Sequence, residues 1–355
     1  MFKLERKYTL IIFLVVIIGL IMVYSSSIMW AEFKYNDSFF FIKRQIIFSI
    51  IGIFCYFIFS KINLELLRKY HGFILIISFI SMILVLIPGI GVERNGSRSW
   101  FQLASIYIQP SEFLKFSLIL TSASYLSKRK IDNFIHDLLP LFILVMISFV
   151  LIMLQPDFGS GIVMISSIVV MVFVSGCPFK YFFRVGLLGV LGLIGLIVSA
   201  PYRLERITSF LNPWNDPLGS GFQIIQSLYA ISPGGLFGRG FGNSIQKQFY
   251  LPEPQTDFIF SIFAEEFGLI GAIFLIFLYF MIIYTAIQII KKSSSSFKGY
   301  VGIGIISLFA IQVCINLGVV VGVFPVTGVT LPLFSYGGSS LVVMMSMLGI
   351  VKGIN

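Results

Sequence analysis

One acidic residue stands where a polar loop meets a long apolar run, and its position suits catalysis. Asp257 follows two prolines in the segment 251–260 (LPEPQTDFIF). An aspartate at the start of a helix caps free N–H groups, and the helix dipole keeps it ionised. An ionised carboxylate binds metals and polarises hydroxyl groups, although it is a weak base unless desolvation raises its pKa. Asp257 is therefore a candidate active-site residue, with a plain helix cap as the structural alternative.

Charged side chains also lie inside apolar runs, where they are costly and mark functional sites by default. Glu112 and Lys115 are three residues apart, so they share one face of a helix. We expect this pair either to line a polar cavity that opens outward or to form a structural ion pair. Glu265 and Glu266 allow the same two interpretations. We take Glu112, Lys115 and Glu265 as candidate substrate-binding residues.

Basic residues gather in the loop at about residues 201–257. Arg203 and Arg206 share a face, and Lys247 follows later in the same loop. Because arginine holds phosphate groups through paired hydrogen bonds, these three residues are predicted to hold a pyrophosphate at the membrane surface. The alternative is that they extend towards lipid headgroups. The glycines of 234–242 are interpreted as turns, since they do not join a strand to a helix as a nucleotide cradle would.

The composition indicates that these residues are held by a bundle in a membrane. Of the 355 residues, 57% are hydrophobic and 11% are charged, whereas soluble domains carry about 25% charged residues. The net charge of +10 is dispersed over short loops, which indicates membrane topology and argues against a nucleic-acid partner. The cysteines and histidines lack the spacing of metal ligands, so disulfides and structural zinc are not expected.

Apolar runs long enough to cross a membrane, which takes roughly 20 residues, recur along the whole chain. Ten are predicted, at residues 9–29, 43–60, 72–90, 109–126, 137–155, 159–176, 181–200, 258–290, 300–323 and 336–352. The excess of lysine and arginine on one side places both termini in the cytoplasm. The predicted fold is an all-α polytopic membrane protein with a single domain over 1–355. One large extracytoplasmic loop, about 201–257, lies between spans seven and eight, and most unusual polar segments share its outer face.

Several of these outer-face segments form motifs in a fixed order. The most specific are 109–115 (QPSEFLK), 251–260 and 331–340 (LPLFSYGGSS). Together they resemble the SEDS family (shape, elongation, division and sporulation), whose members include RodA and FtsW. The segments 212–221 (NPWNDPLGSG) and 242–247 (GNSIQK) resemble the FtsW branch. The chain departs from the family at Gln255, where members often have histidine, and at 104–107 (ASIY), which replaces a turn that usually contains glycine.

The resemblance implies a peptidoglycan glycosyltransferase that polymerises lipid II outside the plasma membrane during cell division and releases undecaprenyl pyrophosphate. The implied transfer is inverting, with Asp257 activating the acceptor hydroxyl directly or through a divalent cation such as Mg²⁺ or Mn²⁺. Trp100 would stack on a sugar or close the site. Ser339, in the 331–340 motif, is a further candidate for substrate binding.

The resemblance also implies partners and a location. A class B penicillin-binding protein (a transpeptidase) and other divisome proteins are expected partners, at the division septum of the bacterial plasma membrane. A lipid II flippase is the first alternative, because buried charges and broken helices also suit a transporter. Against it, the inner loops show no specialised segment. The second alternative is a non-catalytic scaffold for the penicillin-binding protein, with spans eight and nine as candidate docking helices.

Overall fold

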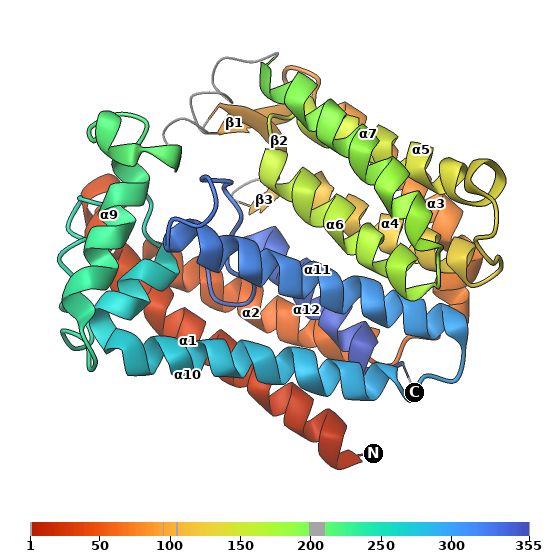
Figure 1. Ribbon diagram of the computed structural model, residues 1–355. Coiled ribbons are helices and arrows are strands. Elements are labelled where there is room, and N and C mark those ends of the chain that lie inside the picture. Colours follow the sequence, from red (N-terminus) through yellow and green to blue (C-terminus); the bar gives the residue numbers. More distant parts are fainter. Residues whose placement is uncertain (1, 95, 104–105, 199–209, 355) are drawn as a thin grey trace.

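The predicted apolar runs all form helices in the computed structural model, which describes residues 2–94, 96–103, 106–198 and 210–354 (Figure 1). The helices that correspond to them are α1 (Phe2–Tyr35), α2 (Phe40–Phe59), α3 (Leu64–Leu84), α4 (Pro110–Leu126), α5 (Leu139–Met153), α6 (Phe158–Val174), α7 (Phe179–Val198), α10 (Ile259–Ile290), α11 (Ser296–Val320) and α12 (Gly338–Lys352). A π-helical turn, η1 (Phe134–Leu138), leads into α5. Buried apolar residues from α1 to α12 form one connected core.

These helices make the chain a polytopic membrane protein. Within the described residues, six helical segments are long and apolar enough to cross a membrane: α1, α2, α3, η1 with α5, α10 and α11. The helices α6 and α12 are apolar but shorter. The count of ten spans and the cytoplasmic placement of the termini stay predictions. Both ends of the described chain lie at the same end of the bundle, as an even number of spans requires (Figure 1).

The all-α prediction is wrong in one place, between α3 and α4. Here β1 (Gly91–Arg94), β2 (Ser97–Leu103) and β3 (Ile106–Ile108) form an antiparallel sheet in chain order. Arg94 pairs with Ser97, so the Asn-Gly dipeptide at 95–96 joins β1 to β2, and Gly96 has a φ of 76°. Asn-Gly between two short strands is the strongest local signal for a hairpin. The third span accordingly ends at Leu84 rather than at residue 90, because the chain turns there towards the sheet.

The long loop predicted between spans seven and eight is a packed structure from residue 210 onward. It contains η2 (Pro213–Asn215), α9 (Phe222–Ile231) and η3 (Ser232–Gly234). The Ser227 hydroxyl of α9 donates to the Val320 carbonyl at the end of α11, at 2.8 Å. The Asp216 carboxylate accepts hydrogen bonds from the Ser220 N–H and hydroxyl and from the Gly219 N–H, and these bonds lower the pKa of Asp216. In Figure 1, α9 lies at the opposite end of the bundle from the chain ends.

The predicted span 258–290 is broken at Gly268, whose φ is 68° and ψ is −166°. The N–H groups of residues 239 and 240 donate to the carbonyls of Glu265 and Glu266 at 2.9 and 3.0 Å. In return, residues 269 and 270 donate to the carbonyls of 235 and 236 at 2.9 and 3.2 Å. A Cβ on Gly238 would lie 2.2 Å from the Glu266 carbonyl oxygen, so this close approach requires glycine. A short helix, 259–267, is thereby separated from the rest of α10.

Candidate active site

Asp257 lies half-buried directly before Phe258, the N-cap residue of α10. The Asn316 side-chain amide of α11 donates to the Asp257 backbone carbonyl at 2.7 Å and to the Val329 carbonyl at 2.8 Å. The backbone of Gly328 lies beside the carboxylate, because a Cβ built there would be 3.8 Å from an Asp257 Oδ atom. Asn316 therefore ties the turn that carries Asp257 to the non-helical segment 327–330.

A second carboxylate, Asp157, is held next to the same segment. It caps α6 by accepting from the Ser160 N–H at 3.1 Å, and its other oxygen accepts from the Gln109 side-chain amide at 3.1 Å. Gly159, two residues after Asp157, packs directly against the segment 327–330, since a Cβ on Gly159 would lie 2.4 Å from the Thr327 carbonyl oxygen. The turns that carry Asp157 and Asp257 thus flank one common segment, 327–330, at the end of the bundle away from the chain ends.

Ser339 and Trp100 lie on the elements around this region. The Ser339 hydroxyl, at the start of α12, donates to the Tyr107 carbonyl at 2.8 Å and accepts from the Gln109 N–H at 3.3 Å. Trp100 is half-buried in β2, paired with Val92. Ser339 is therefore connected to Asp157 through Gln109, while Trp100 belongs to the sheet that leads into α4.

Glu112 and Lys115 form the ion pair that their spacing predicted. The Lys115 Nζ is 2.8 Å from a Glu112 carboxylate oxygen, and the two side chains are 2% and 5% exposed. The other carboxylate oxygen of Glu112 has no hydrogen-bond partner among the described residues. The pair lies in the first two turns of α4, just inside Gln109. Its contact with substrate stays a prediction.

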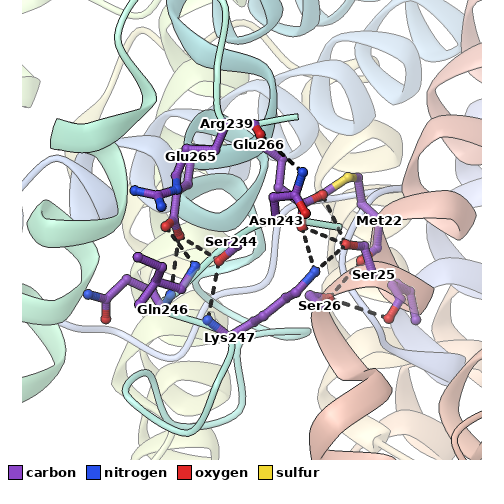
Figure 2. Close-up of polar contacts among 12 residues, drawn as sticks. Met22, Ser25, Ser26, Arg239, Asn243, Ser244, Gln246, Lys247, Glu265 and Glu266 are labelled. Carbon is purple, nitrogen blue, oxygen red and sulfur yellow. Dashed lines mark hydrogen bonds and ion pairs between the residues drawn. The ribbon is translucent and has the colours of Figure 1, made fainter. Parts of the chain in front are cut away.

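Lys247 and Glu265 lie in a buried cluster of their own (Figure 2), and their contact with substrate stays a prediction. The Lys247 Nζ donates to Glu266 at 2.8 Å and to the Ser25 hydroxyl at 3.1 Å, and the Lys247 side chain is 5% exposed. Its charge is therefore paired within the protein. Glu265 accepts from the Ser244 hydroxyl at 2.5 Å and from the N–H of residue 245 at 2.8 Å.

Arg203 and Arg206 lie outside the described residues. Among the basic residues that the structure describes, Arg44 and Arg94 are close enough to the Tyr336 hydroxyl, just before α12, to affect it electrostatically. Burial raises the pKa of the Tyr336 hydroxyl, and the two guanidinium groups act in the opposite direction. Arg94 also lies over the Tyr107 ring, 4.6 Å from its centroid. These two arginines bring positive charge to the region around Tyr107 and Tyr336, whereas the sequence analysis used them only for membrane topology.

The described residues do not contain a group of three or more His, Cys, Asp or Glu side chains that could hold a metal ion. Mg²⁺, however, is commonly held by one or two carboxylates together with substrate phosphates. Asp257 therefore fits a divalent cation shared with a phosphate-bearing substrate and does not fit a closed metal cage. The three cysteines are free thiols.

Sequence reasoning missed Asn316 and gave no role to Asp157 or Gln109. The signal for Asn316 was present, because a polar side chain within an apolar span is a functional candidate by default. Asp157 and Gln109 each precede an apolar run, but nothing in the sequence indicates that they contact each other across 48 positions.

The fold and the site define a polytopic membrane protein in which the turns that carry Asp157 and Asp257 flank the segment 327–330 at one end of the helix bundle. Residues 5–355 match the family model described as "Cell cycle protein" (FtsW, RodA and SpoVE). The chain belongs to this family, which confirms the SEDS resemblance. It is 49% identical to stage V sporulation protein E of Bacillus subtilis, over 98% of this chain and 95% of that protein. It is 41% identical to the probable peptidoglycan glycosyltransferase FtsW of Saccharophagus degradans, over 95% and 89% of the two chains.

Solved structures show the same fold. One, described as "Structural coordination of polymerization and crosslinking by a peptidoglycan synthase complex", contains a chain that matches with a TM-score of 0.80 and 32% identity, over 98% of this chain and 96% of that chain. The rod shape determining protein RodA of Thermus thermophilus matches with a TM-score of 0.71 and 28% identity, over 97% and 94% of the two chains.

Proposed function

We propose that this chain, a peptidoglycan glycosyltransferase, polymerises lipid II at the outer face of the bacterial plasma membrane and releases undecaprenyl pyrophosphate. The observation that carries the proposal is the placement of Asp257 beside the segment 327–330, at the end of the bundle that also holds the sheet and α9. Relatives named as probable peptidoglycan glycosyltransferases FtsW, 41% identical or less, support the reaction class.

The transfer inverts the configuration of the donor sugar. The acceptor hydroxyl oxygen forms a bond to the anomeric carbon of the donor, while the bond from that carbon to the pyrophosphate oxygen breaks. Asp257 takes the proton of the acceptor hydroxyl as a general base. Its carboxylate lies directly before Phe258, the N-cap residue of α10, and beside the backbone of Gly328. A divalent cation such as Mg²⁺ or Mn²⁺, bound by Asp257 and the pyrophosphate, would stabilise the charge of the leaving group.

The other site residues bind and orient the two substrates. Arg203 and Arg206 hold the pyrophosphate. Arg44 and Arg94 contribute further positive charge near Tyr336. The Glu112–Lys115 pair contributes a polar surface for substrate, and the carboxylate oxygen of Glu112 that has no partner among the described residues would accept a hydrogen bond from a sugar hydroxyl. Trp100 stacks on a sugar ring. Ser339 holds the turn at Tyr107 and Gln109 in place.

The enzyme works with a class B penicillin-binding protein and other divisome proteins at the division septum. The structural match described as coordinating polymerisation with crosslinking supports this partner class. A role in sporulation is the second candidate for when the enzyme acts, and the 49% identity to stage V sporulation protein E favours it.

A pair of assays separates polymerase from flippase and scaffold. Purified protein with its penicillin-binding partner is incubated with labelled lipid II, and glycan strands are resolved by gel electrophoresis. In parallel, liposomes that carry the protein and fluorescent lipid II report transfer between leaflets. We expect strands without leaflet transfer. Leaflet transfer without strands would establish the flippase, and crosslinking stimulated without either would establish the scaffold.

A further inference from the structure

A buried group of charged side chains lies at the break of α10, apart from the proposed active site (Figure 2). We call it the Lys247 cluster, and its members are Ser25, Ser244, Lys247, Glu265 and Glu266. The two glutamates occupy the last turn of the helix 259–267, where the helix dipole opposes negative charge. Carboxylates in this position need compensating partners.

Each glutamate obtains its partners from a different part of the chain. Glu266 accepts from the Ser25 hydroxyl of α1 at 2.7 Å and from the Lys247 ammonium at 2.8 Å. Glu265 accepts from the Ser244 hydroxyl at 2.5 Å and from the N–H of residue 245 at 2.8 Å. The cluster therefore joins the end of the helix 259–267 to α1 and to the outer loop at once.

The helix 259–267 is held at both of its ends. Its far end carries the Lys247 cluster and the backbone bonds to residues 239 and 240. Near its beginning, Asn316 binds the carbonyl of Asp257, and the Tyr336 N–H donates to the Gln255 carbonyl at 2.9 Å. Because Gly268 interrupts α10, the remainder of that helix does not fix the tilt of 259–267.

We propose that Lys247, Glu266 and Ser25 are positioning residues that set the tilt of the helix 259–267 and thereby the place of Asp257. The expected effect on the rate of polymerisation rests on the proposed function, whereas the expected effect on the orientation of the helix 259–267 does not. Nine helical residues span about 13 Å, so a tilt of roughly 5° about the Gly268 end moves Asp257 by about 1 Å. A misplacement of about 1 Å costs on the order of 100-fold in rate.

Neutral variants of the ion pair test this proposal. Glu266→Gln and Lys247→Met each leave one buried charge unpaired, so the double variant Lys247→Met/Glu266→Gln removes both charges and keeps a foldable core. We expect the folded double variant to lose about 10- to 100-fold in kcat with a KM for lipid II within about twofold of wild type. We also expect faster hydrogen exchange in residues 253–267. Glu65→Gln, which breaks the exposed pair with Arg68 on α3, is the control and should change neither readout.

Each outcome decides the proposal. A folded double variant with wild-type kcat and unchanged exchange in 253–267 would overturn it, while the proposed function would stand. Faster exchange spread evenly over α1, α11 and 253–267 would show a general structural role instead and would also overturn it. If the wild-type protein makes no glycan, the proposed function fails, and the local exchange of 253–267 still decides whether the cluster holds this helix.

Discussion

Among the described residues two ion pairs are buried, and only one of them could be predicted from the sequence. Glu112 and Lys115 are three positions apart on one helix, so their contact follows from helical spacing. Lys247 and Glu266 are 19 positions apart and meet because the outer loop folds back on α10. The same limit explains why local motifs could mark Asp257 and Ser339 as candidates, while the contact between Asp157 and Gln109 could not be predicted.

Removal of one partner of the α4 pair should be more damaging than removal of both. Lys115→Met leaves the buried Glu112 without its counter-charge, and we expect the free energy of unfolding to fall by about 3–5 kcal/mol. The double variant Glu112→Gln/Lys115→Met should recover most of that loss, because no unpaired charge remains. Thermal unfolding in detergent measures both. A single variant as stable as the double variant would show that the pair is not desolvated.

Asn316 should affect rate through its hold on the Asp257 turn. Asn316→Asp keeps the shape of the side chain but removes the N–H donor that binds the carbonyls of Asp257 and Val329. We expect kcat for lipid II polymerisation to fall on the order of tenfold or more, because the carboxylate of Asp257, the proposed general base, is then less well placed. Unchanged kcat in this variant would mean that the turn is fixed by other contacts.

At the scale of helices and strands, an element could be predicted when the residues that determine it lie within the element itself. Apolar runs of sufficient length predicted all the helices that correspond to the proposed spans. The hairpin β1–β2 was also readable from the Asn-Gly dipeptide at 95–96, but an assignment based on hydropathy passes over it. The break at Gly268 was not predictable, because it depends on residues 235–240 supplying the hydrogen bonds that α10 gives up.

This exchange of hydrogen bonds makes Gly238 a sensitive position. Gly238→Ala would place a Cβ 2.2 Å from the Glu266 carbonyl oxygen, at a φ of 80° that disfavours side chains. We expect a loss of about 1–3 kcal/mol in the free energy of unfolding, or more, from overpacking. Gly72→Ala on α3 is the matched control, since nothing lies within 4 Å of its Cβ. Equal unfolding temperatures for the two variants would contradict the close approach.

In the molecule as a whole, the long connections with secondary structure of their own lie at one end of the bundle. The sheet, α9 and the turns that carry Asp157 and Asp257 lie away from the end where the chain begins and finishes (Figure 1). The connections at that other end, such as 60–63 and 291–295, are short. This asymmetry fits a reaction carried out on one face of the membrane better than transport, which needs access from both faces.

The most direct measurement compares two aspartate variants for polymerisation of labelled lipid II, each with the class B penicillin-binding partner and with and without Mg²⁺ or Mn²⁺. Asp257→Asn removes the proposed base, and Asp216→Asn makes the same chemical change in the exposed turn of the outer loop. We expect Asp216→Asn to retain wild-type activity and Asp257→Asn to lose about 10²- to 10⁴-fold. Glycan strands made at the wild-type rate by folded Asp257→Asn protein would contradict the assignment of Asp257 as the catalytic residue.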